Sequence, residues 1–337
     1  MKIDFCKSAM FLTAALAAAA LSACVQTSEE KSFSETAQTL KDAVSNGGRA
    51  DTKPLPNVLV CNQAISGLQI LDTSKDWSDK SAIIWQWTPE NAKGLDKKYA
   101  STFRFISDCK PVMGCSRILT VASHGAVALV RVDNGEVEFF GDAGGNVHSA
   151  ELLPDGNIVS ASSHGNYITL FNRSEYVAGK PCTAQKRYPL NFAHGVVWDN
   201  SRRILWALGR FELAGYEYNF DKLNPELTKK FSYKLPPECV VGHDLYPVAG
   251  SDSLLFVSGD AGLAVFDVEK RAFEKISDIA RIKSVSLSKA GGALIFMVPE
   301  TRWWAQSVSF GGKTDKKIGR LPDAKIYKAR FFVPSTF

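Results

Sequence analysis

The sequence predicts an all-β protein with the architecture of a six-bladed β-propeller. From Asn57 onward, apolar and polar residues alternate with a period of two, in short runs divided by Asp-Gly, Asn-Gly and Gly-Gly turns. A pair of such runs recurs six times along the chain. The last run has no following partner and the first pair has no preceding one, so the two chain ends complement each other. These three observations predict a closed ring of repeated sheets.

The repeats share one frame of two strands and the turn between them. Residues 57–72 align with residues 157–172 without a gap, and the same frame accepts residues 118–133, 204–218, 254–267 and 294–310. A further strand precedes each copy, starting near Ser101, His148, His194, His243, Lys283 and Tyr327, which are 40 to 49 residues apart. This spacing is typical of four-stranded propeller blades.

The final strand, residues 327–333, is expected to complete the first blade and so close the ring. A seventh blade would need another unit, and the insertion over residues 89–100 is too short to supply one. The period of two excludes a helical solenoid, whereas a stacked β-sandwich stays open as an alternative.

The N-terminal residues have the pattern of an export signal. Lys2 and Lys7 precede an apolar run over residues 9–21 that is too short for a permanent membrane span. The segment Leu21-Ser22-Ala23-Cys24 resembles the lipobox of bacterial lipoproteins, which implies cleavage after residue 23 and a lipid, including palmitate-type acyl chains, on Cys24. The alternative is an ordinary secretory signal cut at the same place. Val25 follows the cysteine, which under that family's sorting rule implies the outer membrane.

The organisation expected is therefore a signal peptide over residues 1–23, a lipid-anchored flexible linker over residues 24–56, and a propeller over residues 57–337. The linker carries one weak amphipathic pattern, formed by Phe33, Ala37, Leu40 and Val44. We expect a monomer whose membrane contact is the anchor.

Composition excludes several classes of protein. With 45% hydrophobic and 22% charged residues the chain is not disordered, and a formal net charge of +5 is too small to favour a nucleic-acid partner. Five cysteines follow Cys24 in the expected oxidising compartment, an odd number that leaves at least one unpaired. Cys109 and Cys115, close together in one hairpin, are the candidate disulfide; a metal cluster is less favoured because no C-x-x-C pair occurs.

The segment Gly141-Asp-Ala-Gly-Gly-Asn-Val-His-Ser-Ala-Glu-Leu-Leu-Pro-Asp-Gly-Asn157, with His194-Gly-Val-Val-Trp198 and Gly242-His-Asp-Leu-Tyr-Pro247, resembles a family of exported bacterial propeller proteins of unknown function. The resemblance supports the fold and implies no activity.

Two rings of residues are predicted around one mouth of the propeller channel. The inner ring holds the residues that begin the innermost strands, Tyr327, Ser101, His148, His194, His243 and Lys283, and the outer ring holds Ala64, His124, His164, Arg210, Asp260 and Glu300. All five histidines fall in these positions. Three residues further along the inner strands, a deeper layer is expected from Arg330, Arg104, Glu151, Val197, Tyr246 and Ser286.

His148, His194 and His243 are candidate ligands of a divalent metal such as zinc, manganese or calcium, with Glu151 or Asp244 completing or orienting the shell. The competing interpretation is structural, because histidines resemble these in position in WD-repeat propellers, where they bond neighbouring strands.

Arg104 and Arg330 are candidate clamps for a carboxylate, unless one of them pairs with Glu151. Lys283 and Tyr327 form a candidate proton-transfer pair, unless the lysine is simply solvated. Of Trp303 and Trp304, one is expected to pack between blades and the other, taken as Trp304, to stack on a sugar.

Two functions follow from this mouth. One is an enzyme similar in kind to propeller lyases that act on uronate-containing glycans, with Lys283, Tyr327 or His124 as the base, or a metal-assisted hydrolase. The other is a non-catalytic surface lipoprotein that binds a glycan or a protein. In both cases His164, Arg210, Asp260, Glu300 and Trp304 are candidate ligand contacts.

Overall fold

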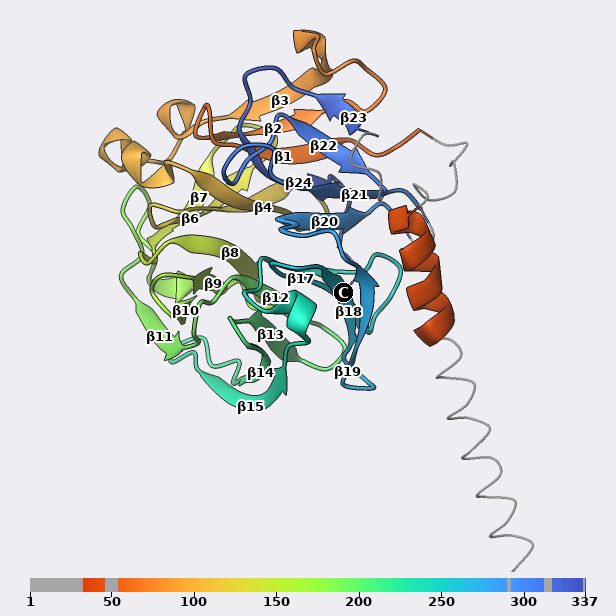
Figure 1. Ribbon diagram of the computed structural model, residues 1–337. Helices are drawn as coiled ribbons and strands as arrows, with labels where there is room; N and C mark the ends of the chain where they lie inside the picture. The colour runs from red at the N-terminus through yellow and green to blue at the C-terminus, as the bar shows by residue number, and fades with distance from the viewer. Residues whose placement is uncertain (1–32, 46–53, 290–291, 312–316, 336) are drawn as a thin grey trace, which may run out of the picture.

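The computed structural model describes residues 33–45, 54–289, 292–311, 317–335 and 337. Six antiparallel sheets of four strands each stand in a ring (Figure 1). The predicted six-bladed β-propeller is confirmed. The signal peptide and Cys24 lie outside the described residues.

Each blade is a meander that runs outward from the channel. Blade 1 contains β24 (Ile326–Phe331), β1 (Val58–Asn62), β2 (Gly67–Leu71) and β3 (Ile83–Trp87). Blade 2 contains β4 (Ile106–Val112), β5 (Arg117–Ala122), β6 (Ala126–Arg131) and β7 (Val137–Asp142), and blade 3 contains β8 (Val147–Leu152), β9 (Ile158–Ser162), β10 (Tyr167–Phe171) and β11 (Gln185–Pro189).

The second half of the ring repeats the same order. Blade 4 contains β12 (Gly195–Asp199), β13 (Ile204–Leu208), β14 (Glu212–Tyr218) and β15 (Leu227–Lys234). Blade 5 contains β16 (Asp244–Pro247), β17 (Leu254–Ser258), β18 (Leu263–Asp267) and β19 (Ala272–Ser277), and blade 6 contains β20 (Ser284–Leu287), β21 (Leu294–Met297), β22 (Ser307–Phe310) and β23 (Lys317–Arg320).

The ring closes through the C-terminal strand. β24 pairs antiparallel with β1, with Phe331 opposite Val58 and Arg330 opposite Leu59. The first blade therefore takes its innermost strand from the end of the chain, as the sequence predicts.

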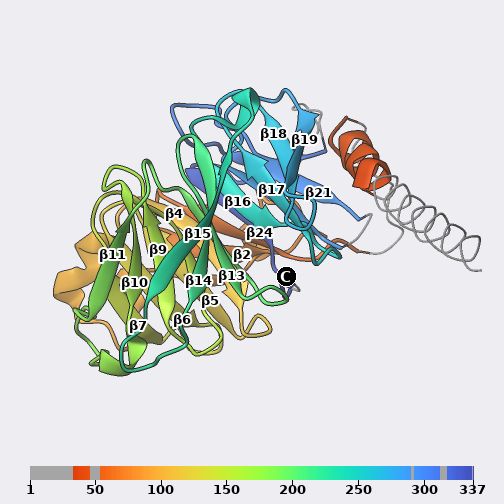
Figure 2. The ribbon, with the colours of Figure 1, turned by 90° about the horizontal axis from the view of Figure 1, so that it is seen from below.

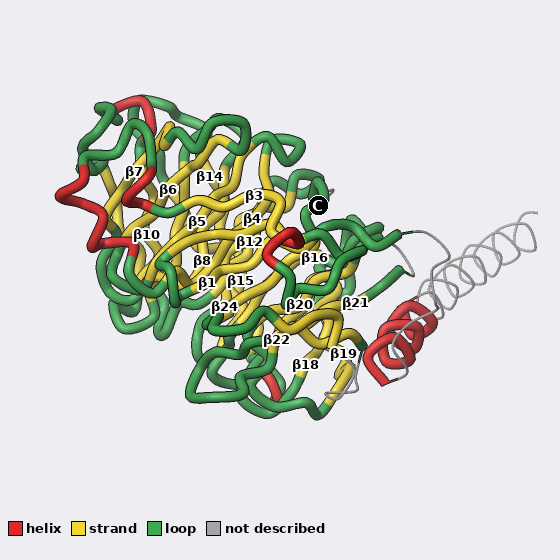
Figure 3. The backbone as a smooth tube through the Cα atoms, turned by 90° about the horizontal axis from the view of Figure 1, so that it is seen from above, coloured by secondary structure: helices red, strands yellow, loops and turns green. Residues whose placement is uncertain are grey.

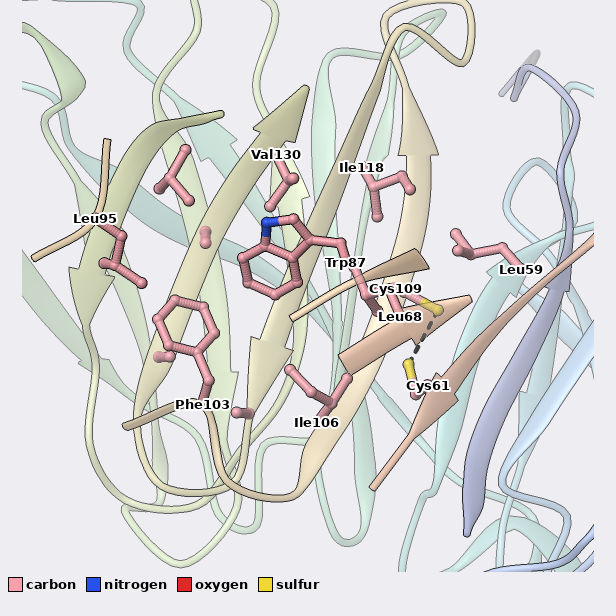
Figure 4. Close-up of a cluster of buried hydrophobic side chains, with 14 of the residues drawn as sticks. Leu59, Cys61, Leu68, Trp87, Leu95, Phe103, Ile106, Cys109, Ile118 and Val130 are labelled. Carbon is pink, nitrogen blue, oxygen red and sulfur yellow. Dashed lines mark hydrogen bonds between the residues drawn. The ribbon is translucent and has the colours of Figure 1, made fainter. Parts of the chain in front are cut away.

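The core consists of apolar side chains packed between neighbouring blades. Between blades 1 and 2, Leu59, Leu68 and Trp87 meet Ile106 and Ile118, all of them buried (Figure 4). Alternate residues of each strand face one neighbouring blade or the other, which explains why the central strands are apolar on both faces. Burial of this kind contributes about 25 cal/mol per Å² of apolar surface and holds adjacent blades together.

Residues 33–45, inside the expected linker, form a helix that packs against blade 5 beside β18 and β19 (Figure 2). Its buried residues Ala37, Leu40 and Val44 follow the amphipathic pattern noted in the sequence, and they contact a cluster that includes Phe256 and Ile276. Lys41 adds an ion pair with Glu274 at 2.7 Å. Within the described residues, no helix has the length and apolarity required to cross a membrane.

Short 3₁₀ helices lie in the connections between strands (Figure 3). They are η1 (Lys80–Ala82), η2 (Pro89–Asn91), η3 (Lys97–Phe103), η4 (Arg173–Glu175) and η5 (Pro237–Cys239). The element η3 corrects one expectation, because the inner strand of blade 2 begins at Ile106 and not near Ser101. The Asp96 side chain accepts a hydrogen bond from the Lys98 amide and starts this helix, so residues that alternate like a strand form a helical turn.

Candidate functional site

The same backbone conformation precedes the inner-ring residue in most blades. In five blades, a residue with a left-handed backbone stands two positions before the ring residue: Phe105 (φ 57°), Asn146 (62°), Phe192 (52°), Val241 (57°) and Arg281 (58°). Non-glycine residues adopt this conformation rarely, and for valine it is strained. The repetition identifies Ser107 as the inner-ring residue of blade 2, in place of Ser101. The ring is therefore Ser107, His148, His194, His243, Lys283 and Tyr327.

Three buried histidines lie side by side at this mouth. The rings of His148 and His194 stack with centroids 4.2 Å apart and planes at 9°, and His194 meets His243 edge-on at 5.6 Å. They come from three consecutive blades and are at most 6% exposed. The sequence prediction that these imidazoles converge is therefore seen in the structure.

Burial keeps the three imidazoles neutral. Desolvation lowers the pKa of His148 and His194 well below 6.5, with nearby Lys328 adding to it at His148 and the neighbouring His148 ring at His194. Desolvation and then the charge of Lys283 lower the pKa of His243 to about 4. At neutral pH these rings therefore act as neutral hydrogen-bonding groups.

His243 is held between an acid and a base. Its Nε2 lies 2.7 Å from Asp260 Oδ1, and Lys283 Nζ lies 3.1 Å from both Nδ1 and Nε2. With Nε2 donating to the carboxylate, the lysine amine lies equally close to both ring nitrogens and therefore against the face of the imidazole. Desolvation lowers the pKa of Lys283 to about 8, so a fraction of this amine is unprotonated at neutral pH.

Tyr327 bonds to a different histidine. Its hydroxyl lies 3.1 Å from His148 Nδ1, and burial raises its pKa above the ordinary value, so it donates this hydrogen bond. Lys283 and Tyr327 thus each contact a histidine, and among the described residues no hydrogen bond joins the two directly.

His194 differs from the other two histidines because its ring has no hydrogen-bond partner among the described residues. Its Nδ1 is buried and unsatisfied. Its ring contacts are with the rings of His148, His243 and Phe192. A buried polar atom without a partner costs free energy, so His194 does not fit the interpretation of a satisfied structural histidine.

The outer ring lies where the sequence predicts, in the turns between the second and third strands. His124, His164, Asp260 and Glu300 are exposed, as is Ala64, whereas Arg210 is half-buried. His124 packs edge-on against Phe105.

Cations and aromatic rings alternate on the rim of the same mouth. Arg210 lies 5.5 Å from the rings of both Phe192 and Phe211, and the latter is 55% exposed. Arg302 lies over Trp303. Trp303 is the more exposed member of the tryptophan pair, whereas Trp304, the predicted sugar platform, is half-buried beneath Lys325.

Arg104 does not enter the channel, contrary to the sequence prediction. It follows η3, is exposed, and lies over the Phe105 ring on the rim. Lys110, three residues after Ser107, occupies the predicted place in the deeper layer. Lys110 pairs with Glu151 at 2.9 Å, and burial raises the pKa of that carboxyl.

Arg330 points into the channel but is already engaged by protein carboxylates. It donates two hydrogen bonds to Asp244, at 2.6 and 2.7 Å, and a longer one to Asp108. Lys328 joins the same group through Asp244 at 3.0 Å. Burial alone would raise the pKa of Asp244, but the charges of Arg330 and Lys328 lower it below its ordinary value. Arg330 is therefore part of a buried ionic cluster below the mouth, and among the described residues Asp244 makes no hydrogen bond to a histidine ring.

Sequence reasoning missed Asp108, Lys110 and Lys328. Two of them can be found once the inner-ring residue of blade 2 is placed at Ser107 instead of Ser101. Asp108 and Lys110 then follow it by one and three residues on the same inner strand. Lys328 follows Tyr327 directly, so it falls outside the positions three residues along the inner strands at which the deeper layer is expected.

A pocket of about 310 Å³ lies at the opposite end of the channel, where the inner strands end. Lys110, Glu151 and Tyr246 line it together with Trp198 and Phe337. Lys110 and Glu151 are paired with each other there, whereas the histidine mouth has an unsatisfied polar atom, His194 Nδ1. The mouth is for this reason the stronger candidate site.

Within the described residues, no group of three or more His, Cys, Asp or Glu side chains is arranged to hold a metal ion. Parallel stacked rings such as those of His148 and His194 do not aim their nitrogens at one point. Metal binding stays a prediction of the sequence, and no later step relies on it.

Comparison with known proteins gives a family and no activity. No curated protein matches the chain. A crystal structure of a protein of unknown function from Bacteroides caccae is similar, with 13% sequence identity, a TM-score of 0.48, and coverage of 82% of this chain and 98% of that one. The family model described as "Family of unknown function (DUF6528)" matches residues 55–337. The match spans the whole propeller, and the chain therefore belongs to the DUF6528 family.

Proposed function

We propose that this protein is an exported, lipid-anchored propeller that binds an anionic glycan, of the uronate-containing kind, at its histidine mouth. The observation that carries the proposal is His194, a buried imidazole with no hydrogen-bond partner among the described residues. Once the ring turns its buried Nδ1 toward the mouth, a hydroxyl or carboxylate of a ligand would satisfy it, and a neutral imidazole can both donate and accept such bonds.

The charge of the mouth supports an anionic ligand. Lys283 lies beside His243, with a pKa of about 8 that leaves it mostly protonated at neutral pH. Arg210 and Arg302 stand on the rim above it. Cations of this kind attract carboxylates, and the arginine forks bind them in bidentate fashion.

The aromatic rings of the rim support a carbohydrate. Phe211 and Trp303 are 55% and 41% exposed. Exposed aromatic rings offer apolar faces against which the C–H faces of sugar rings pack, while the polar groups at the centre bond the hydroxyls.

Attachment to the outer membrane is part of the proposal and rests on the sequence. The apolar leader and the lipobox-like residues up to Cys24 support it. The helix over residues 33–45 would leave only a short segment between the lipid and the docked domain.

Binding is tested by titrating the protein with oligogalacturonate and oligoalginate, beside neutral oligosaccharides of equal length, in a calorimeter. We expect His194→Ala to weaken binding of the preferred anionic glycan roughly tenfold, the equivalent of about 1.4 kcal/mol. The control is Lys229→Ala, on the outermost strand of blade 4 and away from the mouth. Equal binding by both variants and the unmodified protein would reject the site.

A second candidate function is elimination from a uronate, and the chain from Asp260 through His243 to Lys283 favours it. Unprotonated Lys283 would remove the proton from the carbon beside the carboxylate. The released electron pair would form a carbon–carbon double bond while the bond to the glycosidic oxygen breaks. That oxygen would take a proton from Tyr327, which burial keeps protonated.

Elimination is measured by the ultraviolet absorbance of the new double bond after incubation with the same glycans. Lys283→Arg preserves the cation and removes the base, so we expect binding without turnover. Lys229→Arg, at the outer edge of blade 4, is the control. If the unmodified protein binds a uronate glycan but no double bond forms, the proposed binding function stands and the proposed elimination is rejected.

A further inference from the structure

Two cysteines from neighbouring blades meet in the buried core. Cys61 lies on β1 and Cys109 on β4, with their Sγ atoms 2.9 Å apart (Figure 4). Neither residue has exposed surface. They are 48 residues apart in the sequence, so the ring fold brings them together.

The separation of these sulfur atoms is shorter than an ordinary packing contact. Non-bonded carbon atoms keep about 3.5 to 4.0 Å, and sulfur is larger than carbon. The remaining cysteines have different surroundings, because Cys182 and Cys239 contact backbone oxygens and Cys115 lies half-exposed in the turn after β4. The structure thus sets Cys61, not the expected Cys115, beside Cys109.

We propose that Cys61 and Cys109 form a disulfide bond that links blade 1 to blade 2. The oxidant is a disulfide-bearing molecule, either a protein thiol oxidase or a small disulfide such as oxidised glutathione. Each cysteine gives up one proton and one electron to form the new S–S bond, and the oxidant's disulfide takes up both electrons and both protons to become two thiols. An exported protein meets such oxidants outside the cytoplasm.

The bond is formed while the blades assemble. Once packed, both sulfur atoms are out of reach of any oxidant. Burial also raises the pKa of the Cys61 thiol, which leaves little of the reactive thiolate in the folded protein. The same burial protects the finished bond from reductants.

The pairing is tested by unfolding the protein, refolding it with reduced and oxidised glutathione, and quenching it in acid. Free thiols are then alkylated in denaturant before peptide mapping by mass spectrometry. We expect a linked peptide pair containing Cys61 and Cys109, with Cys182 and Cys239 alkylated. Recovery of Cys61 and Cys109 as alkylated peptides, or of a bond between Cys109 and Cys115, would overturn the proposal.

Stability gives an independent measurement. For a loop of this length a disulfide raises the midpoint of thermal unfolding by roughly 5 to 10 °C. We expect the protein refolded with the redox pair to melt higher than the same protein refolded with a reductant, and Cys61→Ala to abolish that difference. Cys239→Ala, a buried cysteine without a sulfur neighbour among the described residues, is the control that keeps it. A redox difference that persists in Cys61→Ala would contradict the assignment.

Discussion

The imidazole rings of His148 and His194 lie face to face, with centroids 4.2 Å apart and planes only 9° from parallel. Two protonated rings would repel each other at this distance, so the stack requires that at least one of them stay neutral. The arrangement therefore couples the charge state of the mouth to its geometry.

Acid is expected to destabilise the fold before the carboxylates titrate. The pKa of all three histidines is lower in the folded protein than the ordinary 6.5. The unfolded chain then binds more protons, so stability is full above pH 6.5 and declines as pH falls toward the folded values. For His243, whose folded pKa is about 4, the loss amounts to about 3 kcal/mol, at about 1.4 kcal/mol per pKa unit.

Denaturant unfolding between pH 7 and pH 4 measures this decline. His243→Gln should flatten it, and His124→Gln, at an exposed position, should not. A profile with the same slope in both variants would show that other groups cause the loss.

Replacement of a single charged residue of the buried ionic cluster is expected to destabilise the fold strongly. Asp244→Ala removes the closer of the two carboxylates that Arg330 and Lys328 share and leaves them only Asp108, and we expect a loss of about 3 to 5 kcal/mol in the free energy of unfolding. The control is Asp133→Ala, which removes an exposed pair with Arg131 and should cost less than about 1 kcal/mol. Chemical denaturation checks both, and similar losses would contradict the special role of the cluster.

The helix over residues 33–45 is expected to detach when its buried face carries a charge. Leu40→Asp places a carboxylate in the cluster with Phe256 and Ile276, and we expect cleavage of the segment by a protease to accelerate roughly tenfold or more. The control, Ser34→Asp, places the same charge on an exposed residue of the first turn of this helix. The helix is held by other contacts if both variants are cleaved at the unmodified rate.

Lipidation is expected to depend on one cysteine of the leader region. Cys24→Ala should abolish incorporation of labelled palmitate and release the protein from the membrane fraction, since the acylated residue is missing. Cys6→Ala, inside the predicted signal peptide, should leave both unchanged. Labelling that survives Cys24→Ala would refute the lipoprotein assignment.

The repeat frame predicts most of the fold because each blade buries the same two apolar strands. Five of the six inner strands begin within one residue of the positions inferred from His148, His194, His243, Lys283 and Tyr327. The exception is blade 2, where the alternation around Ser101 resembles a strand but the Asp96 cap starts η3, which contains Ser101 and ends just before Arg104. Local hydrogen bonding outweighed the periodicity there.

The candidate site was predicted in composition but not in its bonding. Spacing alone gathers His148, His194 and His243, since equivalent positions of a repeat lie at equivalent places. Which of them is satisfied depends on partners from other blades, such as Asp260 for His243 and Tyr327 for His148. These pairings can be predicted only when the start of every inner strand is placed correctly. Because the inner strand of blade 2 was expected near Ser101, Asp108 and Lys110 were not among the predicted channel residues.

The pairing of β24 with β1 also constrains how the protein is made. During synthesis β1 is made first and β24 last of all the strands. Blade 1 therefore lacks its innermost strand until synthesis is nearly complete. Until then the unpaired edge of β1 can form hydrogen bonds with strands of other chains or with the wrong strand of its own chain.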